Sequence, residues 1–140
     1  MAVSTATIGL GTLLQRDDGA SGWDTITEIT NLDGPSGSLD VIDVTHMESA
    51  DNYREFIAGL LDGGEVSMEL QWSPQTANQL LLLTDHQART NQNWRIVTPA
   101  AIGLTWTFSG FVTAYSPASP VDGKNTCSAT IKITGKPALA

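Results

Sequence analysis

The residue types that most often carry chemistry are few in this sequence, and they stand far apart. The two histidines, His46 and His86, have no second histidine or cysteine at the spacing of a metal site, and neither has a neighbour that would orient it as a general base. Cys127 is the single cysteine, so it cannot form an internal disulfide. Because no histidine or lysine flanks it to favour the thiolate, we expect a small buried side chain rather than a nucleophile.

Short acidic and glycine-rich segments also fail to make a site. Asp17-Asp18-Gly19 and Asp62-Gly63-Gly64-Glu65 resemble fragments of calcium loops, but the alternating series of acidic ligands is absent, and turns explain both segments. Gly9-Leu10-Gly11 lacks the third glycine of a dinucleotide-binding loop. The sequence therefore predicts a protein that is not an enzyme, with no catalytic, metal-binding or cofactor-binding residues.

Charge is unevenly distributed along the chain. The net charge is -8, yet residues 1–70 carry -11 and residues 71–140 carry +3. A net acidic chain lacks the basic face that sequence-reading nucleic-acid binding requires. The split has two interpretations, a solvated surface or an acidic side that meets the basic side of another copy. No apolar run approaches the roughly 18–20 residues of a membrane helix, and we expect no secretion signal at the N-terminus.

Alternation of apolar and polar residues predicts three clear strands. In two of them the inward positions are Val66, Met68, Leu70 and Trp72, and Cys127, Ala129, Ile131 and Ile133. The third covers residues 104–109, after which Gly110 shifts the phase and predicts a bulge or bend. Weaker strands are expected near residues 7–10, 25–30, 39–45 and 94–98.

One helix is predicted between the strand that ends at Trp72 and the strand expected near residues 94–98. Ser73 can cap it, Pro74 fits its first turn, and residues 76–89 form its body. The expected buried stripe is Ala77, Leu80, Leu81 and Ala88. Antiparallel strands with one flanking helix predict a mainly-β (α+β) sandwich or barrel, in a single domain over residues 1–140.

Residues 46–64 form a long inter-strand loop in this prediction, and the loop carries a heavy apolar load. Its apolar residues are Tyr53, Phe56, Ile57, Leu60 and Leu61. Their spacing fits one face of a short helix folded onto its own domain, although Gly59 disfavours a helix. The other interpretation is an adhesive arm that buries these side chains in a neighbouring molecule, and the residues alone leave both open.

Four segments, in this order, resemble the tail tube proteins of long-tailed bacteriophages, the lambda-like tail tube family. They are residues 14–20 (LQRDDGA), residues 26–30 with 33–35 (ITEIT, DGP), residues 42–49 (IDVTHMES) and residues 53–67 (YREFIAGLLDGGEVS). Together they span about half of the chain, and their order and spacing are more specific than any one piece. We expect no appended immunoglobulin-like domain, which some members of the family carry.

The resemblance implies an assembly. Proteins of this family form β-sandwiches with a flanking helix, gather into six-fold rings whose inner strands join into one β-barrel, and stack as the hollow tube that guides the genome at ejection. It implies a place in the virion tail and, as partners, further copies of the chain, a tape-measure protein, a tail-tip initiator, a terminator, and phage DNA that passes without specific binding. Related folds occur in contractile tails, type VI secretion tubes and gene transfer agents.

Within such a tube the loop would bridge rings, and we expect its inter-subunit contacts at Tyr53, Arg54, Phe56, Ile57, Leu60 and Leu61. The lumen should be polar and neutral to negative so that DNA slides without sticking, and the outward face at Ser67, Glu69 and Gln71 suits it. Lys132 fits this wall only if Glu69 offsets its charge.

Two alternatives stay open. One is a ring-forming terminator or baseplate component of the same tail. The other is a small β-sandwich that binds a ligand or carbohydrate in a groove with exposed aromatics, for which Trp23, Trp72, Trp94 and Trp106 are the candidates.

Overall fold

Nine strands, all paired antiparallel, and one α-helix between the sixth and seventh strands make up the described part of the chain. A computed structural model describes residues 3, 4, 6, 8–73, 75 and 77–140. The elements are β1 (Leu13–Asp17), β2 (Trp23–Thr25), β3 (Ile29–Asp33), β4 (Ser38–Asp43), the 3₁₀ turn η1 (Ala50–Asn52), β5 (Phe56–Asp62), β6 (Glu65–Gln71), α1 (Ala77–Ala88), β7 (Gln92–Val97), β8 (Thr105–Ala118) and β9 (Thr126–Leu139). The predicted class, mainly antiparallel β with one helix, is confirmed.

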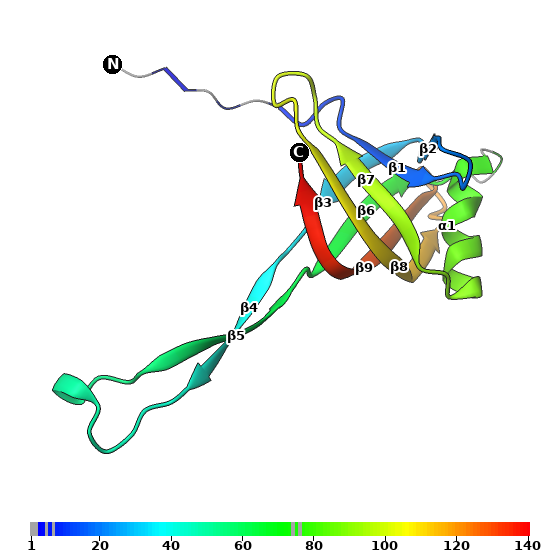
Figure 1. The fold of residues 1–140 in the computed structure, drawn as a ribbon. Coiled ribbons are helices and arrows are strands. Elements are labelled where there is room, and N and C mark those ends of the chain that lie inside the picture. Colours follow the sequence, from blue (N-terminus) through cyan, green and yellow to red (C-terminus); the bar gives the residue numbers. More distant parts are fainter. Residues whose placement is uncertain (1–2, 5, 7, 74, 76) are drawn as a thin grey trace.

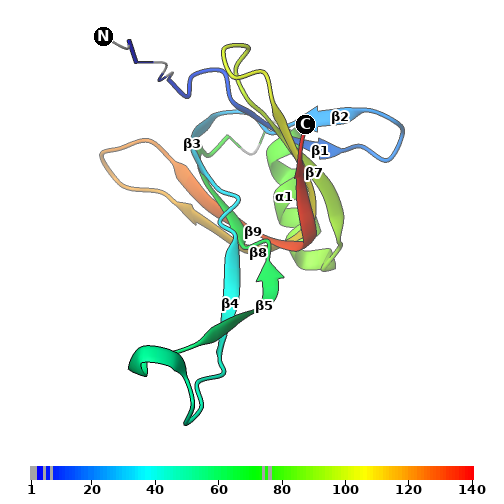
Figure 2. The same ribbon diagram turned by 60° about the vertical axis from the view of Figure 1, so that its left-hand side comes forward.

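Seven strands form one sheet in the order β2-β1-β7-β8-β9-β6-β3. The sheet curls into a barrel-like wall with α1 along one side, while β4 and β5 form a separate two-stranded sheet that projects from it (Figure 1). A turned view shows β3 and β2 on either side of the opening of the curled sheet (Figure 2). The core therefore lies inside a single wall rather than between two independent sheets.

The strongest strand predictions are confirmed in β6 and β9. Val66, Met68 and Leu70 are buried on one face of β6, and the four inward residues predicted for β9 are buried as well. The two strands pair in register from Glu65 opposite Lys132 to Gln71 opposite Thr126. Cys127 is buried among them, and burial raises the pKa of its thiol, as expected for a packing residue.

The interruption expected at Gly110 is a register shift within one long strand. β8 runs without a break, and its pairing with β9 shifts between Thr107 and Ser109 and again between Val112 and Ala114. A Cβ on Gly110 would lie 2.6 Å from the carbonyl oxygen of Lys132, so the close approach of the two strands requires glycine there.

Two of the weaker strand predictions need correction. Ile8, Gly9 and Leu10 form no strand, and Thr7 lies outside the described residues. The strand expected over residues 25–30 is divided into β2 and β3, because the chain turns inward between them to bury Ile26.

The helix forms where it was predicted, but the predicted buried stripe is wrong at Leu80 and Ala88, while Leu81 is half-buried. Leu80 is 42% exposed and Ala88 is exposed, whereas Gln79, Leu82 and Asp85 are buried. The backbone N–H of Ser73 donates to Gln79 Oε1 at 2.8 Å, and the predicted side-chain cap involves residues outside the described part of the chain. Pro74 and the side chain of Ala77 lie outside the described residues. The buried face of α1 can be partly polar because Gln79 and Asp85 form hydrogen bonds with residues of the sheet and its connections.

Polar contacts fasten α1 to the curled sheet. Arg16 of β1 donates two hydrogen bonds to Asp85, from Nε at 2.6 Å and from Nη2 at 2.9 Å. The Asp85 hydrogen bonds raise the pKa of Arg16, so the guanidinium stays charged. The amide of Gln79 donates to the carbonyl oxygens of Thr27 and Gln71, both at 3.0 Å. The helix therefore joins the first strands to the end of β6.

Removing one side of the buried ion pair should destabilise the domain strongly. We expect Asp85→Ala to lower the free energy of unfolding by about 3 kcal/mol, because Arg16 is left charged and nearly buried. Urea denaturation followed by tryptophan fluorescence measures this loss. Asp122→Ala, at an exposed position, should change it by less than about 0.5 kcal/mol. Equal stability of the two variants would contradict a structural role for the pair.

Candidate functional site

Residues 38–62 form a hairpin, which we call the arm. The prediction of a long loop over residues 46–64 is therefore wrong. Phe56–Asp62 is strand β5, and it pairs antiparallel with β4 from Ser38 opposite Asp62 to Asp43 opposite Phe56. The short-helix interpretation is also wrong, since only Ala50–Asn52 forms a 3₁₀ turn. Apolar residues at positions 56, 57, 60 and 61 fit a helix face, but β4 offers matching apolar residues and a full set of backbone partners.

The arm buries almost nothing within its own subunit. Every residue of β4 is exposed, and in β5 only Gly59 is partly buried. Phe56 is 54% exposed and Leu60 is 82% exposed. The other large apolar residues exposed along the arm are Leu39, Val41, Ile42, Val44, Met47, Tyr53, Ile57 and Leu61. An isolated two-stranded hairpin is marginal in water, and large exposed apolar surfaces are typical of interaction sites.

Close backbone contacts fix the arm at its base. Gly64 has a φ of +78°, and a Cβ there would lie 1.7 Å from the carbonyl oxygen of Ser36. Asp62 accepts hydrogen bonds from the backbone N–H of Gly64 at 2.8 Å and from Lys132 Nζ at 2.9 Å. These bonds, the backbone one first, lower the pKa of Asp62. The expectation that Glu69 offsets Lys132 is therefore corrected: Asp62 is the partner.

A small polar cluster closes the tip of the arm. The Ser49 hydroxyl donates to Glu55 Oε2 at 2.6 Å, and His46 Nδ1 lies 3.2 Å from the same oxygen. The backbone N–H of His46 donates to Ser49 Oγ at 3.0 Å. From the sequence His46 looked isolated. Glu55 lies nine residues from His46 and six from Ser49, so the three side chains meet only once the turn is formed. The Ser49 hydroxyl donates its hydrogen bond to Glu55 and not to His46, and the cluster is exposed to solvent. The three side chains therefore stabilise the turn, and they do not form a serine nucleophile activated by histidine.

The second surface is the outward face of β6 and its neighbours. Ser67 and Glu69 are exposed and Gln71 is half-buried, as their alternation with the core residues requires. Glu69 stands opposite Ser128 of β9 and Asn31 of β3. The face is polar and carries Asp33, Glu65 and Glu69, and Phe111 of β8 is its apolar exception.

Neither surface resembles a reaction centre. Among the residues that the structure describes, no group of three or more histidine, cysteine or acidic side chains is placed to hold a metal ion. Within the same residues, no helix has the length and apolar content to cross a membrane. Trp94 is fully buried and Trp72 packs against the core, whereas Trp106 packs against the core and also lines an open groove at the base of the arm.

A small antiparallel domain with a projecting apolar arm is the architecture of a structural subunit. The family model described as lambda phage tail tube protein (TTP) matches residues 10–140, and the chain belongs to this family. The resemblance seen in the first half of the sequence is thus confirmed over nearly the whole chain. The protein is a structural component of the virion tail.

Solved structures share the fold at low sequence identity. The tail of an empty gene transfer agent particle with C6 symmetry superposes with a TM-score of 0.82 at 18% identity, covering 96% of this chain and 99% of that one. The SPP1 tail tube superposes with a TM-score of 0.63 at 11% identity, covering 91% of this chain and 74% of that one. An extracellular contractile injection system, the PVC sheath/tube terminator in its extended state, gives 0.72 at 13% identity, covering 99% of both chains. No curated protein matches the chain significantly.

The glycine at the base of the arm should be indispensable. We expect Gly64→Ala to lower the free energy of unfolding by about 3 kcal/mol, because a methyl group overlaps the Ser36 carbonyl as well as straining the backbone. Gly19→Ala is the matched control, since its φ is +80° with no atom within 4 Å of the new Cβ, and it should lose only about 1 kcal/mol. Chemical denaturation measures both, and equal losses would show that the contact with Ser36 relaxes freely.

Proposed function

We propose that this chain forms six-fold rings that stack head to tail into the hollow tail tube, with the hairpin arm joining one ring to the next. The observation that carries the proposal is the arm itself, an element of about 25 residues whose large apolar side chains the rest of the described chain leaves exposed. The six-fold symmetry is supported by the tail of the gene transfer agent particle, whose fold this chain shares.

Ring closure would use the open edges of the curled sheet. β2 and β3 are the terminal strands of the seven-stranded order, and each has one side without a strand partner among the described residues. Exposed strand edges pair readily with another chain, and closing a ring removes them. Residues 1–140 act as one tail tube domain in this proposal, and the arm is its extension.

The polar face of β6 would line the lumen. Its acids, Asp33, Glu65 and Glu69, give it a negative charge, and Lys132 is already neutralised by Asp62. Such a wall repels the phosphate backbone, so DNA can pass without binding. The tape-measure, tail-tip and terminator proteins expected of the family are the further partners, and the role of the chain is structural rather than catalytic.

A ring-forming terminator or baseplate component is the second candidate. The same fold occurs in the anti-feeding prophage cap, with a TM-score of 0.70 at 11% identity. Such a component would form discrete rings. The tail tube proposal predicts long tubes with a continuous lumen in negative-stain electron microscopy of the assembled protein, and rings that never stack would favour the alternative.

Polar substitutions on the arm should abolish tube growth. We expect the Phe56→Ser/Leu60→Ser double variant to remain folded, because both side chains are exposed in the subunit, and to form no tubes. Circular dichroism and sedimentation measure folding, and electron microscopy counts tubes. Val121→Ser, which removes a fully exposed apolar side chain from the β8–β9 loop, should leave growth unchanged. Tubes of normal length from the double variant would overturn the bridging role.

Reversing the charge at Glu69 should affect DNA passage and leave assembly intact. Six copies of Glu69→Lys in each ring would attract phosphate, so we expect particles with normal tails that eject their DNA about tenfold more slowly at low salt. Asp122→Lys, outside the polar face, is the control with the same charge change. A density map that places Glu69 on the outer wall, or ejection at the normal rate, would refute the lumen assignment.

A further inference from the structure

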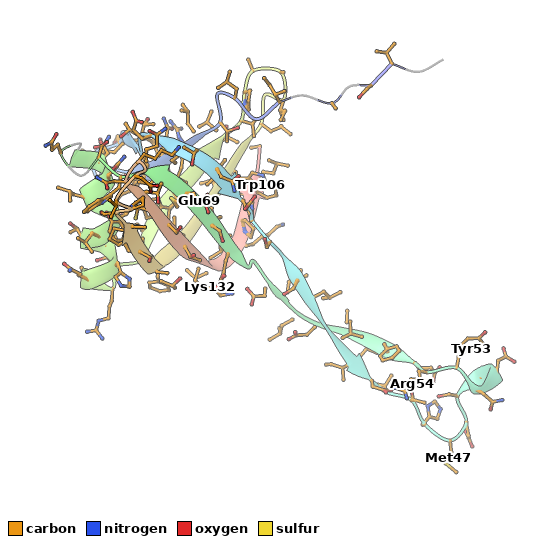
Figure 3. All side chains as sticks on the ribbon, turned by 180° about the vertical axis from the view of Figure 1, so that it is seen from behind. Met47, Tyr53, Arg54, Glu69, Trp106 and Lys132 are labelled. Carbon is orange, nitrogen blue, oxygen red and sulfur yellow. The ribbon has the colours of Figure 1, made fainter. Side chains whose placement is uncertain are left out.

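An open groove lies where the arm leaves the sheet. It has a volume of about 760 Å³ and is mostly apolar, with Leu39 and Leu61 from the arm on one side and Trp106 and Pro137 on the other. This volume lies within the range of pockets that bind side chains and small ligands, roughly 300–1,000 Å³. Trp106 stands at the end of the sheet nearest the arm (Figure 3). The groove is thus continuous with the apolar surface of the arm.

The groove has one free charge, and it is positive. Asp62 contributes to the lining but is neutralised by Lys132. Lys136 also lines the groove, is exposed, and forms no ion pair with any residue in the described part of the chain. An occupant that suits this site would offer apolar side chains together with a carboxylate.

The other cations of the chain fit this role less well. Arg16 and Lys132 are held by Asp85 and Asp62, and Arg95 lies 4.5 Å from the ring centre of Trp23. Arg54 belongs to the arm. Lys124 and Arg89 line none of the apolar groove, so Lys136 is the cation that stands beside a large apolar opening.

The tip of the arm has the matching chemistry. Met47 is fully exposed and Tyr53 is 75% exposed, and both lie at the far end of the arm from Trp106 (Figure 3). Residues 43–55 carry four acids against Arg54, and Glu48 follows Met47 directly. The His46–Ser49–Glu55 contacts hold this turn in shape, which reduces the entropy lost on docking.

We propose that the arm tip of one copy docks in this groove of a copy in the adjacent ring, with Met47 against Trp106 and Glu48 toward Lys136. The inference rests on the proposed bridging of rings and names the surface that receives the arm. A thioether against an indole is a favourable contact, and a carboxylate beside Lys136 supplies the charge that the groove lacks.

The two ends of the arm make this contact self-propagating. The tip cannot reach the base of its own arm, because strand β4 (Ser38–Asp43) stands between them and alone spans roughly 20 Å at about 3.3 Å per residue. A tip that docks at the base of the next arm leaves that second tip free for a third copy. Such a head-to-tail contact between unlike patches continues without limit along the tube unless it closes within one ring.

Disulfide trapping tests the contact directly. In a Cys127→Ala background, tubes of the Glu48→Cys/Lys136→Cys variant should give, on oxidation, a ladder of covalent multimers that extends beyond six subunits on a non-reducing gel. Each single cysteine variant should give no ladder. A ladder that stops at six would place the contact between neighbours within a ring and overturn the assignment to adjacent rings.

Charge reversal gives a second measurement that does not depend on disulfide geometry. We expect Lys136→Glu to slow tube growth about tenfold and Glu48→Lys/Lys136→Glu to restore most of the rate, whereas Lys124→Glu grows normally. Absence of both the ladder and the rescue would overturn the groove assignment. If the arm variant Phe56→Ser/Leu60→Ser still fails to grow in that case, bridging by the arm stands. If it grows, the bridging role of the arm falls as well, while the tube itself remains the assembly that the chain forms.

Discussion

One constraint governs this structure: a single seven-stranded sheet must cover its own apolar side. β6, β7, β8 and β9 each turn alternate residues inward, and the sheet buries them by curling around them rather than by packing on a second sheet. Curling leaves one side of the core open, and α1 covers it. The helix is held there by the Arg16–Asp85 ion pair and the hydrogen bonds of Gln79 as well as by the burial of Leu82. The outward side is then free to be polar, and the hairpin arm lies outside the core altogether.

Stability and association are therefore divided between different parts of the chain. The curled sheet folds without the arm's side chains, because Phe56, Leu60 and their neighbours contribute no burial to it. The arm in turn keeps its apolar surface without collapsing onto the domain, since glycines and the Asp62–Lys132 contact fix its base. This division lets a subunit remain folded while it still exposes the arm that we propose to join one ring to the next.

The sequence predicts the strands correctly where apolar residues alternate with polar ones and one face of the strand is buried in the core. The alternation in β6 and β9 gave both the strands and their inward residues, and the same alternation placed Glu69 on the outward face. The arm was misread as a loop because its apolar residues satisfy helical spacing, and strand pairing with β4 is a long-range property. The buried face of α1 was missed because Gln79 and Asp85 are polar, and their partners Thr27 and Arg16 are remote in sequence. The tip cluster of His46, Ser49 and Glu55 likewise needs the closed turn.

The covalent path from arm to sheet has a mechanical consequence. β5 passes through Gly63 and Gly64 directly into β6, which pairs with β3 on one side and with β9 along its whole length on the other. A pull along the arm is then directed along β6, so the backbone hydrogen bonds of both ladders bear the load together, in shear, instead of being peeled apart one at a time. A tail that bends under load would transmit tension through these strands while each domain keeps its shape.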